Sequence, residues 1–400
     1  MHSRRPMNAA RKLALAALAL VSISLSVATP AAQAATPTVG ERNTPAPITF
    51  DTCYAPNATG PWTKNRFGSC TKTRLSYKRY ACPDAGCAVD GTASAFVTTI
   101  SNLVPGTRQV LVGHQMGGFY TDLPETTRIG LAIECVPKNT SGTARCDQPS
   151  ATIVKSIAEW RTQMNEFTTL AFDGEDLPDP AQPPEIQAEK RTGYTLSYRM
   201  FVEEPPGTRS ELTTGASSFG VRCDVVRQLN PSYGRGADCA FPHETYFYVD
   251  RADALNAESA RLISDGIVGS SAAYPPLGGG WFIPGYPGVG GREVWRRPLT
   301  RQYYDTASQQ AHRAVAENSC VTRWGPDYQQ RPGGGTNVCA AFPFDATRQG
   351  ATPRGGTPGP TYVVRPVATA DYQELLTRLQ TFLADNHILD GDNYWVYPVN

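Results

Sequence analysis

The sequence predicts an α+β protein in which an N-terminal all-β, sandwich-like and disulfide-bonded region precedes a small α+β C-terminal domain. Three observations support this fold class. Short runs of alternating apolar residues, separated by Pro, Gly, Asn and Asp, fill residues 63–250. Apolar residues at helix spacing first appear after residue 250. Ten cysteines fall in five close pairs along the 400 residues.

Residues 1–34 have the layout of a secretory signal peptide. Basic residues at positions 4, 5, 11 and 12 precede an apolar run over residues 13–28, and Ala32–Ala34 resembles a cleavage site. The run is short for a membrane span, and no later segment is longer and as apolar. We therefore expect a secreted, extracellular protein without a membrane span. The Arg4–Arg5 pair would also suit twin-arginine export, but the residues that follow it match that signal poorly.

The charge of the mature chain gives no general attraction for polyanions. Of the 37 Lys and Arg residues, four lie in the signal peptide, whereas none of the 36 Asp and Glu residues does. The net charge after cleavage is therefore near minus three, so any contact with nucleic acid must come from a local patch. Residues 290–400 contain Arg but no Lys, which suits phosphate contacts but is equally expected from a GC-rich genome.

The cysteines predict disulfide bonds, because an even number of cysteines in an exported protein is typically oxidised. Local pairing is the simplest arrangement. It gives Cys53–Cys70, Cys82–Cys87, Cys135–Cys146, Cys223–Cys239 and Cys320–Cys339. Structural zinc is the alternative, but no second Cys or His pair lies at metal-ligand spacing.

Composition divides the chain into segments. Residues 35–62 are rich in Thr, Pro and Ala and predict a flexible or loosely docked lead-in. Residues 63–250 predict the β-rich domain, with a loop at 178–184. Residues 251–295 form a connector with a helix over 251–267 and a Gly/Pro-rich stretch over 275–291, which is either a linker or an ordered loop anchored by aromatic residues.

The C-terminal domain, residues 296–400, mixes helices and strands. Asp305 is placed to cap a helix over 306–317, and apolar spacing predicts a second helix over 371–384. Strands are expected at 319–323, 361–367 and 394–399.

Five sequence blocks in this domain occur in a characteristic order. They are Ala311-His312, Cys320-Val-Thr-Arg323, Cys339-Ala-Ala-Phe-Pro-Phe344 with Gln349-Gly350-Ala351, the strand ending near Pro366, and 382–396 with its NHILDGDNYWV run. With these blocks the segment 305–399 resembles the NucA/NucB deoxyribonuclease domain found at the C-termini of secreted actinobacterial proteins. Upstream, the segments 221–224 and 238–242 resemble the disulfide hairpin that often precedes that domain.

The resemblance implies metal-dependent hydrolysis of DNA phosphodiester bonds, with Mg²⁺ or Mn²⁺ as cofactor and DNA as partner. The family has Asp-Glu after the block cysteine, but Ala340 and Ala341 stand there in this chain. A hard cation needs anionic oxygen ligands, and alanine supplies none.

His312, Asp345 and Asp371 are the candidate catalytic residues that remain. His312 aligns with a family histidine suited to phosphate contact or proton transfer, and its alternative role is structural. Asp345 would lie roughly 13 Å from Ala341 if the strand continued, so a turn or capping role is the alternative. Asp371 falls at a family acid position, but it is also placed to cap the helix that follows.

Four further residues near the C-terminus are weaker candidates for a functional site. Glu374 is a possible additional polar group of a rearranged site. His387 stands at a position that is usually basic in the family, and a surface position is expected for it. Asp390 and Asp392 are either a calcium-binding turn or a plain turn.

Two functions from different classes follow. The first is an exported DNA endonuclease with a rearranged metal site. The second is a catalytically inactive, nuclease-like binding protein whose β-rich region has a partner that the sequence does not identify.

Overall fold

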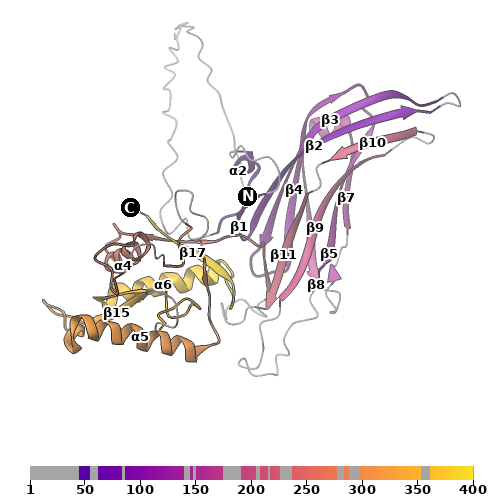
Figure 1. The fold of residues 1–400 in the computed structure, drawn as a ribbon. Coiled ribbons are helices and arrows are strands. Elements are labelled where there is room, and N and C mark those ends of the chain that lie inside the picture. The colour runs from indigo at the N-terminus through magenta and orange to yellow at the C-terminus, as the bar shows by residue number, and fades with distance from the viewer. Residues whose placement is uncertain are drawn as a thin grey trace, which may run out of the picture. The chain divides into compact units, whose positions relative to one another are not determined.

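The chain folds into a strand-rich α+β structure with five disulfide bonds, in agreement with the predicted class (Figure 1). The computed structural model describes residues 45–54, 62–82, 86–138, 145–146, 150–173, 191–203, 208–214, 217–225, 237–276, 283–287, 297–352 and 361–399. The expected signal peptide, most of the lead-in and the loop at 178–184 lie outside these residues. No helix among them is long and apolar enough to cross a membrane.

The β-rich region contains two antiparallel sheets. The first has the order β1-β2-β3-β4-β8-β6, and β10 also pairs with β2. Its strands are β1 (Trp62–Asn65), β2 (Gly68–Ala81), β3 (Ala88–Val104), β4 (Gln109–Thr121), β6 (Arg145–Cys146), β8 (Asn165–Asp173) and β10 (Thr208–Thr214). The second sheet has the order β12-β11-β9-β5-β7. Its strands are β5 (Arg128–Pro137), β7 (Ser150–Ser156), β9 (Arg191–Val202), β11 (Ser217–Val225) and β12 (Ala237–Ala240).

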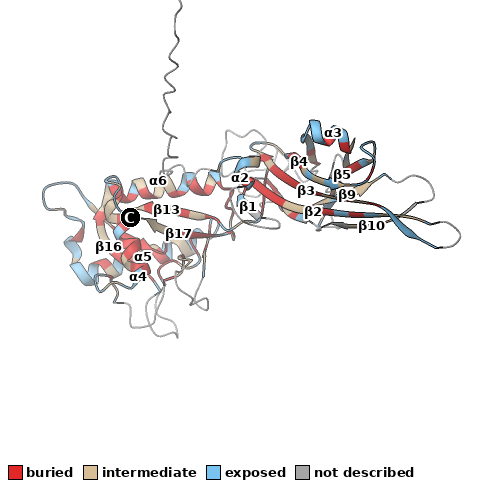
Figure 2. Cartoon of the chain, turned by 90° about the horizontal axis from the view of Figure 1, so that it is seen from above, coloured by how far each residue is buried: buried red, intermediate tan, exposed pale blue. Residues whose placement is uncertain are grey.

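The two sheets pack face to face through the buried side chains of their strands. Buried and exposed residues alternate along the middle of β2, as the period of a strand with one buried face requires (Figure 2). Val112 of the first sheet shares an apolar cluster with Ile133 and Leu196 of the second, and a further cluster joins Leu75 to Leu131.

Two short helices accompany these sheets. The helix α3 (Ile157–Thr162) begins with a capping box formed by Ser156 and Glu159, and it buries Trp160 in the second of those clusters. The helix α2 (Phe50–Tyr54) packs against the first sheet through the Cys53–Cys70 disulfide.

The remaining elements build the C-terminal part around its own core. They are β13 (Tyr246–Asp250), α4 (Ala257–Val268), β14 (Leu299–Thr300), α5 (Thr306–Trp324), the 3₁₀ helix η3 (Pro326–Gln329), β15 (Asn337–Phe342), β16 (Val363–Ala368), α6 (Thr369–Asp385) and β17 (Asn393–Val399). In this part β13 runs parallel to β17, β14 runs antiparallel to β17, and β15 and β16 form an antiparallel pair.

The helix of the expected connector belongs to this core. Leu262 and Ile263 of α4 lie in one apolar cluster with Leu375 and Phe382 of α6. Gly266 permits the close approach, because a Cβ atom there would lie 2.6 Å from Val363. The core of the C-terminal part therefore draws on residues well before 296.

The strand expected at 319–323 is wrong, because these residues continue α5 to Trp324. His312, Ala316 and Cys320 are the buried residues of this helix, and they follow one another at intervals of four. This helical stripe keeps the segment in the helix, although Val321 and Thr322 favour strands.

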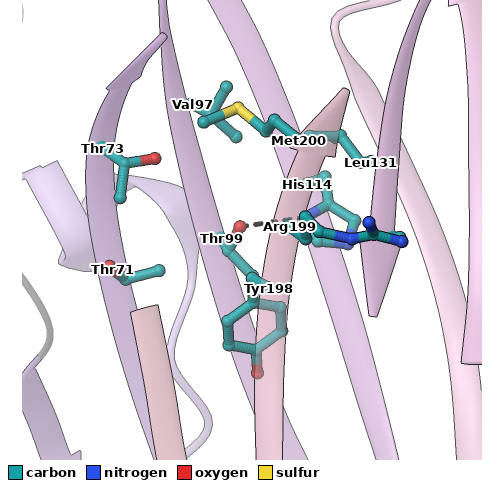
Figure 3. A pocket seen from close by; sticks show the side chains of 10 residues that line it. Thr71, Thr73, Val97, Thr99, His114, Leu131, Tyr198, Arg199 and Met200 are labelled. Carbon is teal, nitrogen blue, oxygen red and sulfur yellow. Dashed lines mark hydrogen bonds between the residues drawn. The ribbon is translucent and has the colours of Figure 1, made fainter. Parts of the chain in front are cut away.

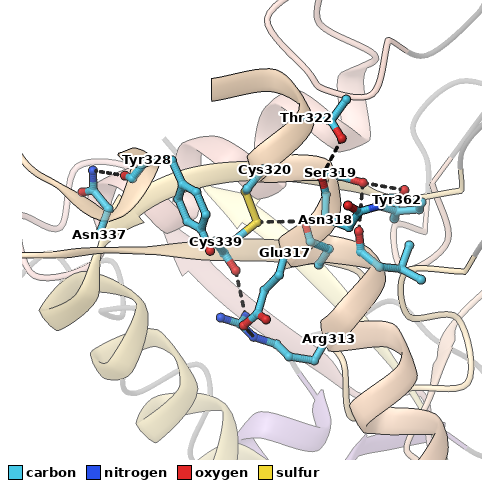
Figure 4. Close-up of a disulfide and its surroundings, with 12 residues drawn as sticks. Arg313, Glu317, Asn318, Ser319, Cys320, Thr322, Tyr328, Asn337, Cys339 and Tyr362 are labelled. Atoms are coloured by element: carbon cyan, nitrogen blue, oxygen red, sulfur yellow. Dashed lines mark hydrogen bonds and ion pairs between the residues drawn. A yellow bond between two sulfur atoms is a disulfide. The ribbon is translucent and has the colours of Figure 1, made fainter. Parts of the chain in front are cut away.

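The five local cysteine pairs are confirmed as disulfides, and no cysteine is free. All ten thiols are therefore used, which removes the zinc alternative for them. Cys320–Cys339 joins the end of α5 to β15, where Arg313 also contacts the strand (Figure 4).

Candidate functional site

Ala340 and Ala341 lie on β15, a strand buried on both faces. Ala340 is 0% exposed and packs with the α4 and α6 cluster. Ala341 is 1% exposed and packs in a second cluster with Ala316 of α5 and Val364 of β16. Because successive residues of a strand point to opposite faces, each alanine faces a different apolar cluster. Neither position offers a polar opening for a metal ligand.

His312 projects from α5 toward the turn after β15. Its Nδ1 lies 3.0 Å from the Asp345 carbonyl oxygen, so this nitrogen carries the proton and donates. A Cβ atom at Gly350 would overlap the imidazole ring, so the glycine of the block allows the histidine to pack closely. The backbone thus fixes the ring and leaves Nε2 for other interactions.

Asp345 lies in the turn that follows β15 and not on an extension of the strand. Burial raises the pKa of its carboxyl group, although the nearby Arg313 and His312 act in the opposite direction. Its Oδ2 is 3.7 Å from Arg313 Nη1, while Oδ1 is buried without a hydrogen-bond partner among the residues described.

Arg313 ties the polar groups of this cluster together. Its Nε donates to Glu317 at 2.8 Å, and its Nη1 donates to the carbonyl oxygen of Cys339 at 2.8 Å (Figure 4). Tyr372 of α6 closes the other side, where it interacts with the Ala341 backbone and the Asp345 charge. Burial raises the pKa of the Tyr372 phenol, and the Asp345 carboxylate adds to this shift.

Asp371 does not join this cluster. Its Oδ1 and Oδ2 accept hydrogen bonds at 2.9 Å from the backbone N–H groups of Ser259 and Glu258, and Oδ1 also accepts from the Ser259 hydroxyl at 2.5 Å. The carboxylate therefore caps α4, which lies over one hundred residues earlier, and not its own helix. Glu374 is likewise occupied, because it accepts from Arg378 at 2.8 Å.

The side chains around His312 do not fit a Mg²⁺ or Mn²⁺ centre. Such a cation prefers several anionic oxygens, but Asp345 and Glu317 both face the guanidinium of Arg313. Asp305, which is also near His312, accepts hydrogen bonds from Ser308 and Gln302. Across the described part of the chain, no group of three or more His, Cys, Asp or Glu residues is arranged to hold a metal ion.

The aspartates of the calcium-turn alternative serve other partners. Asp390 Oδ1 accepts from the Tyr303 backbone N–H at 2.7 Å. Asp392 Oδ2 accepts from the Leu389 N–H at 3.0 Å, and both Asp392 oxygens also bind Arg222. These contacts support the plain-turn interpretation.

The surface position expected for His387 is wrong. The side chain is buried, and its ring packs edge-on against Phe67 with the ring centres 5.2 Å apart. The contact joins the C-terminal part to the start of β2, which the sequence spacing could not indicate.

Two hollows in the structure were not predicted. One has a volume of about 640 Å³, and its lining includes Arg66, Arg222, His243, Asp392 and Trp395. Its volume suits a small ligand. No sequence signal points to it, because its lining residues come from segments more than 300 residues apart.

The other hollow lies between the two sheets and has room for about one water molecule, with a volume near 10 Å³ (Figure 3). His114 lines it and receives or donates a hydrogen bond at 2.9 Å through Nδ1 with Thr99 Oγ1. Its Nε2 has no partner in the described structure, and burial lowers the pKa of the imidazole to about 4.

Comparison of the chain with protein-family models, with curated proteins and with solved structures finds no match. The fold is that of a strand-rich α+β protein with five disulfide bonds.

Proposed function

We propose that this protein is an exported, nuclease-like DNA-binding protein that does not hydrolyse DNA, with a sandwich-like β-rich region ahead of a NucA/NucB-like C-terminal domain. The observation that carries the proposal is the burial of Ala340 and Ala341 in apolar clusters on the two faces of β15. Both faces of the strand that would carry the metal ligands are covered by apolar side chains at these positions.

The remaining polar groups support binding better than hydrolysis. The Nη2 of Arg313 takes no part in the contacts of the His312 cluster and is suited to donate to a phosphate, whereas Asp345 and Glu317 face the other nitrogens of the same guanidinium. Without a metal, a water molecule near neutral pH needs a base to become a nucleophile, and both nearby carboxylates form ion pairs with Arg313. DNA as the ligand comes from the family resemblance.

Plasmid DNA is the direct test. The mature protein is incubated with supercoiled plasmid and Mg²⁺ or Mn²⁺, and nicking and filter retention are measured from about 50 to 200 mM salt. We expect retention that falls steeply with salt, without nicking. The absence of retention at low salt would contradict DNA binding.

One observation favours the endonuclease as a second candidate. Asp345 combines a raised pKa with an unpaired, buried oxygen beside His312, which is the kind of environment that catalytic carboxyl groups have. Metal-dependent nicking that His312→Ala and Asp345→Asn both abolish would establish this candidate instead. Asp327→Asn, at an exposed position of η3, is the matched control.

A further inference from the structure

The outer face of the first sheet carries exposed aromatic rings on three different elements. Tyr54 of α2 is 49% exposed, Phe96 of β3 is 61% exposed and Phe167 of β8 is 54% exposed. Exposed rings that gather on one face, and are not scattered singly, indicate a binding surface. Figure 1 shows the strands of this sheet side by side, and Figure 2 shows the same region from above.

The strand register places these rings on one continuous face. Phe96 pairs across β3 with Arg74 on β2 and with Gly117 on β4. Two residues along, Thr98 pairs with Gln115, and the Tyr54 hydroxyl donates to Gln115 Oε1 at 2.5 Å. These cross-strand neighbours lie about 5 Å apart, and successive rows on the face lie about 7 Å apart.

Two glycines of β4 lie next to the exposed rings of the sheet. Gly113 pairs with Phe167, and a Cβ atom on Gly113 would lie 2.6 Å from the Phe167 ring. Gly117, in the row of Phe96, likewise has no side chain. Phe167 therefore covers the buried backbone of Gly113 and also packs against Phe50 of α2, with the ring centres 6.0 Å apart. The partly exposed backbone of this face lies at Gly117, beside Phe96, where a planar group could lie against the ring.

Cations follow the edge of the same surface. Lys72, Arg74 and Lys78 occupy outward positions of β2, on the same face as Phe96. The Arg74 guanidinium lies 5.9 Å from the centre of the Phe96 ring, and Lys72 Nζ lies 5.4 Å from the centre of Tyr54. No carboxylate of the described residues forms an ion pair with Arg74 or Lys78. Glu211 of β10 lies opposite Lys78 in the register, so the positive part of this edge is at Lys72 and Arg74, next to the rings.

We propose that this face binds single-stranded nucleic acid, with bases stacked on Phe96 and Phe167 and the phosphates along the cations of β2. Exposed rings beside a row of cations are complementary to a polyanion that also carries flat, accessible rings. A duplex hides the faces of its bases, and an acidic polysaccharide has no aromatic face to stack. A single strand offers both accessible bases for the aromatic rings and phosphates for the cations.

This inference goes beyond the proposed function and does not depend on it. The residues that carry it lie in α2, β2, β3, β4 and β8, and the nuclease resemblance covers only 305–399 and a hairpin upstream. Failure at one site would therefore leave the other untouched.

The test uses the full mature protein and a fluorescent, mixed-sequence DNA 12-mer, with binding followed by anisotropy. We expect Phe96→Ala to weaken binding about tenfold or more, because stacking on one ring is lost. We expect Arg74→Gln to weaken binding severalfold and to reduce the slope of log affinity against log salt by about 0.7. Trp324→Ala on α5 and Arg161→Gln on α3, both partly exposed, are the matched controls and should bind as the natural protein does.

Several results would overturn the inference. Failure of the 12-mer to bind at low salt is one, and equal binding by Phe96→Ala is another. A duplex of the same sequence that competes as well as the single strand would show charge attraction without stacking. Binding of a sulfated glycan in place of the 12-mer, with the same dependence on Phe96, would assign the face to an acidic polysaccharide. Retention of supercoiled plasmid by Phe96→Ala and Arg74→Gln should be unchanged, because their C-terminal domain is unaltered. This measurement therefore distinguishes loss of binding at the sheet from failure of the proposed function.

Discussion

Arg222 donates two hydrogen bonds to Asp392, from Nη1 to Oδ1 at 2.7 Å and from Nη2 to Oδ2 at 2.8 Å. The two residues are 170 positions apart in the sequence. Arg222 belongs to β11, beside the Cys223–Cys239 disulfide, and Asp392 ends the turn before β17. A planar guanidinium that meets a carboxylate in this way fixes orientation as well as distance. The pair therefore fastens the β-rich region to the C-terminal part.

Asp392→Asn should destabilise the protein by about 2 kcal/mol, because it removes the carboxylate charge that both Arg222 and Arg66 face, while Asp224 still pairs with Arg222 at 2.6 Å. Urea denaturation gives the free energy of unfolding. Glu125→Gln, which breaks the exposed ion pair with Arg161, is the control and should cost less than about 1 kcal/mol. Equal changes in unfolding free energy for the two substitutions would show that the buried pair contributes no more to stability than the exposed pair does.

The same pair predicts acid sensitivity. Burial raises the pKa of Asp392, but the hydrogen bonds and charge of Arg222 outweigh it, and the net pKa lies below the usual 3.8. A lowered pKa in the folded state stabilises the fold above the usual Asp value, and this contribution is lost as the pH falls through the folded pKa. The difference in unfolding free energy between the natural protein and Asp392→Asn should therefore shrink below pH 4.

The sequence predicted the strand-rich α+β class and all five disulfides, because alternation and cysteine spacing are local signals. It misplaced residues whose partners are distant. Asp371 is suited to capping by its type, but only the tertiary fold places α4 beside it. His387 has no apolar pattern around it that predicts burial against Phe67. The surroundings of Ala340 could not be predicted either, because they depend on how α4 and α6 pack.

Asp371→Ala should lower the unfolding free energy by about 1 to 2 kcal/mol, because the first turn of α4 loses the acceptor of two backbone N–H groups. Plasmid retention should not change, since Asp371 lies outside the His312 cluster. Asp305→Ala removes the cap of α5 and provides the comparison. If Asp371→Ala abolishes a DNA-dependent activity while the fold remains stable, the capping assignment is wrong.

Ala340→Asp should destabilise the protein by several kcal/mol and should not create a nuclease, because it puts a carboxylate into a closed apolar cluster. Ala340→Val, which is larger but apolar, separates the cost of charge from the cost of volume. Thermal unfolding and plasmid nicking are measured on both variants and on Ala340→Asp/Ala341→Glu. A folded double variant that cuts DNA with Mg²⁺ would mean that a metal site survives around β15.

His114 predicts a second acid transition, within the β-rich region. Burial lowers the pKa of its imidazole from 6.5 to about 4, because the protonated ring would be charged between the two sheets. The unfolded chain takes up this proton at higher pH than the folded chain does. The fold therefore keeps the full contribution of neutral His114 above pH 6.5 and loses it progressively as the pH falls toward 4.

The loss should approach about 3 kcal/mol, since each unit of pKa shift corresponds to 1.36 kcal/mol. His114→Gln removes the titration and retains a side chain that can bond to Thr99. We expect the unfolding free energy of the natural protein to fall more steeply than that of the variant between pH 6.5 and 4. Glu166, which lies opposite His114 in the register and pairs with Lys155, is present in both proteins, so its titration cancels in the comparison. Parallel pH profiles would show that the imidazole is protonated in the fold without cost, as it would be if solvent reached Nε2.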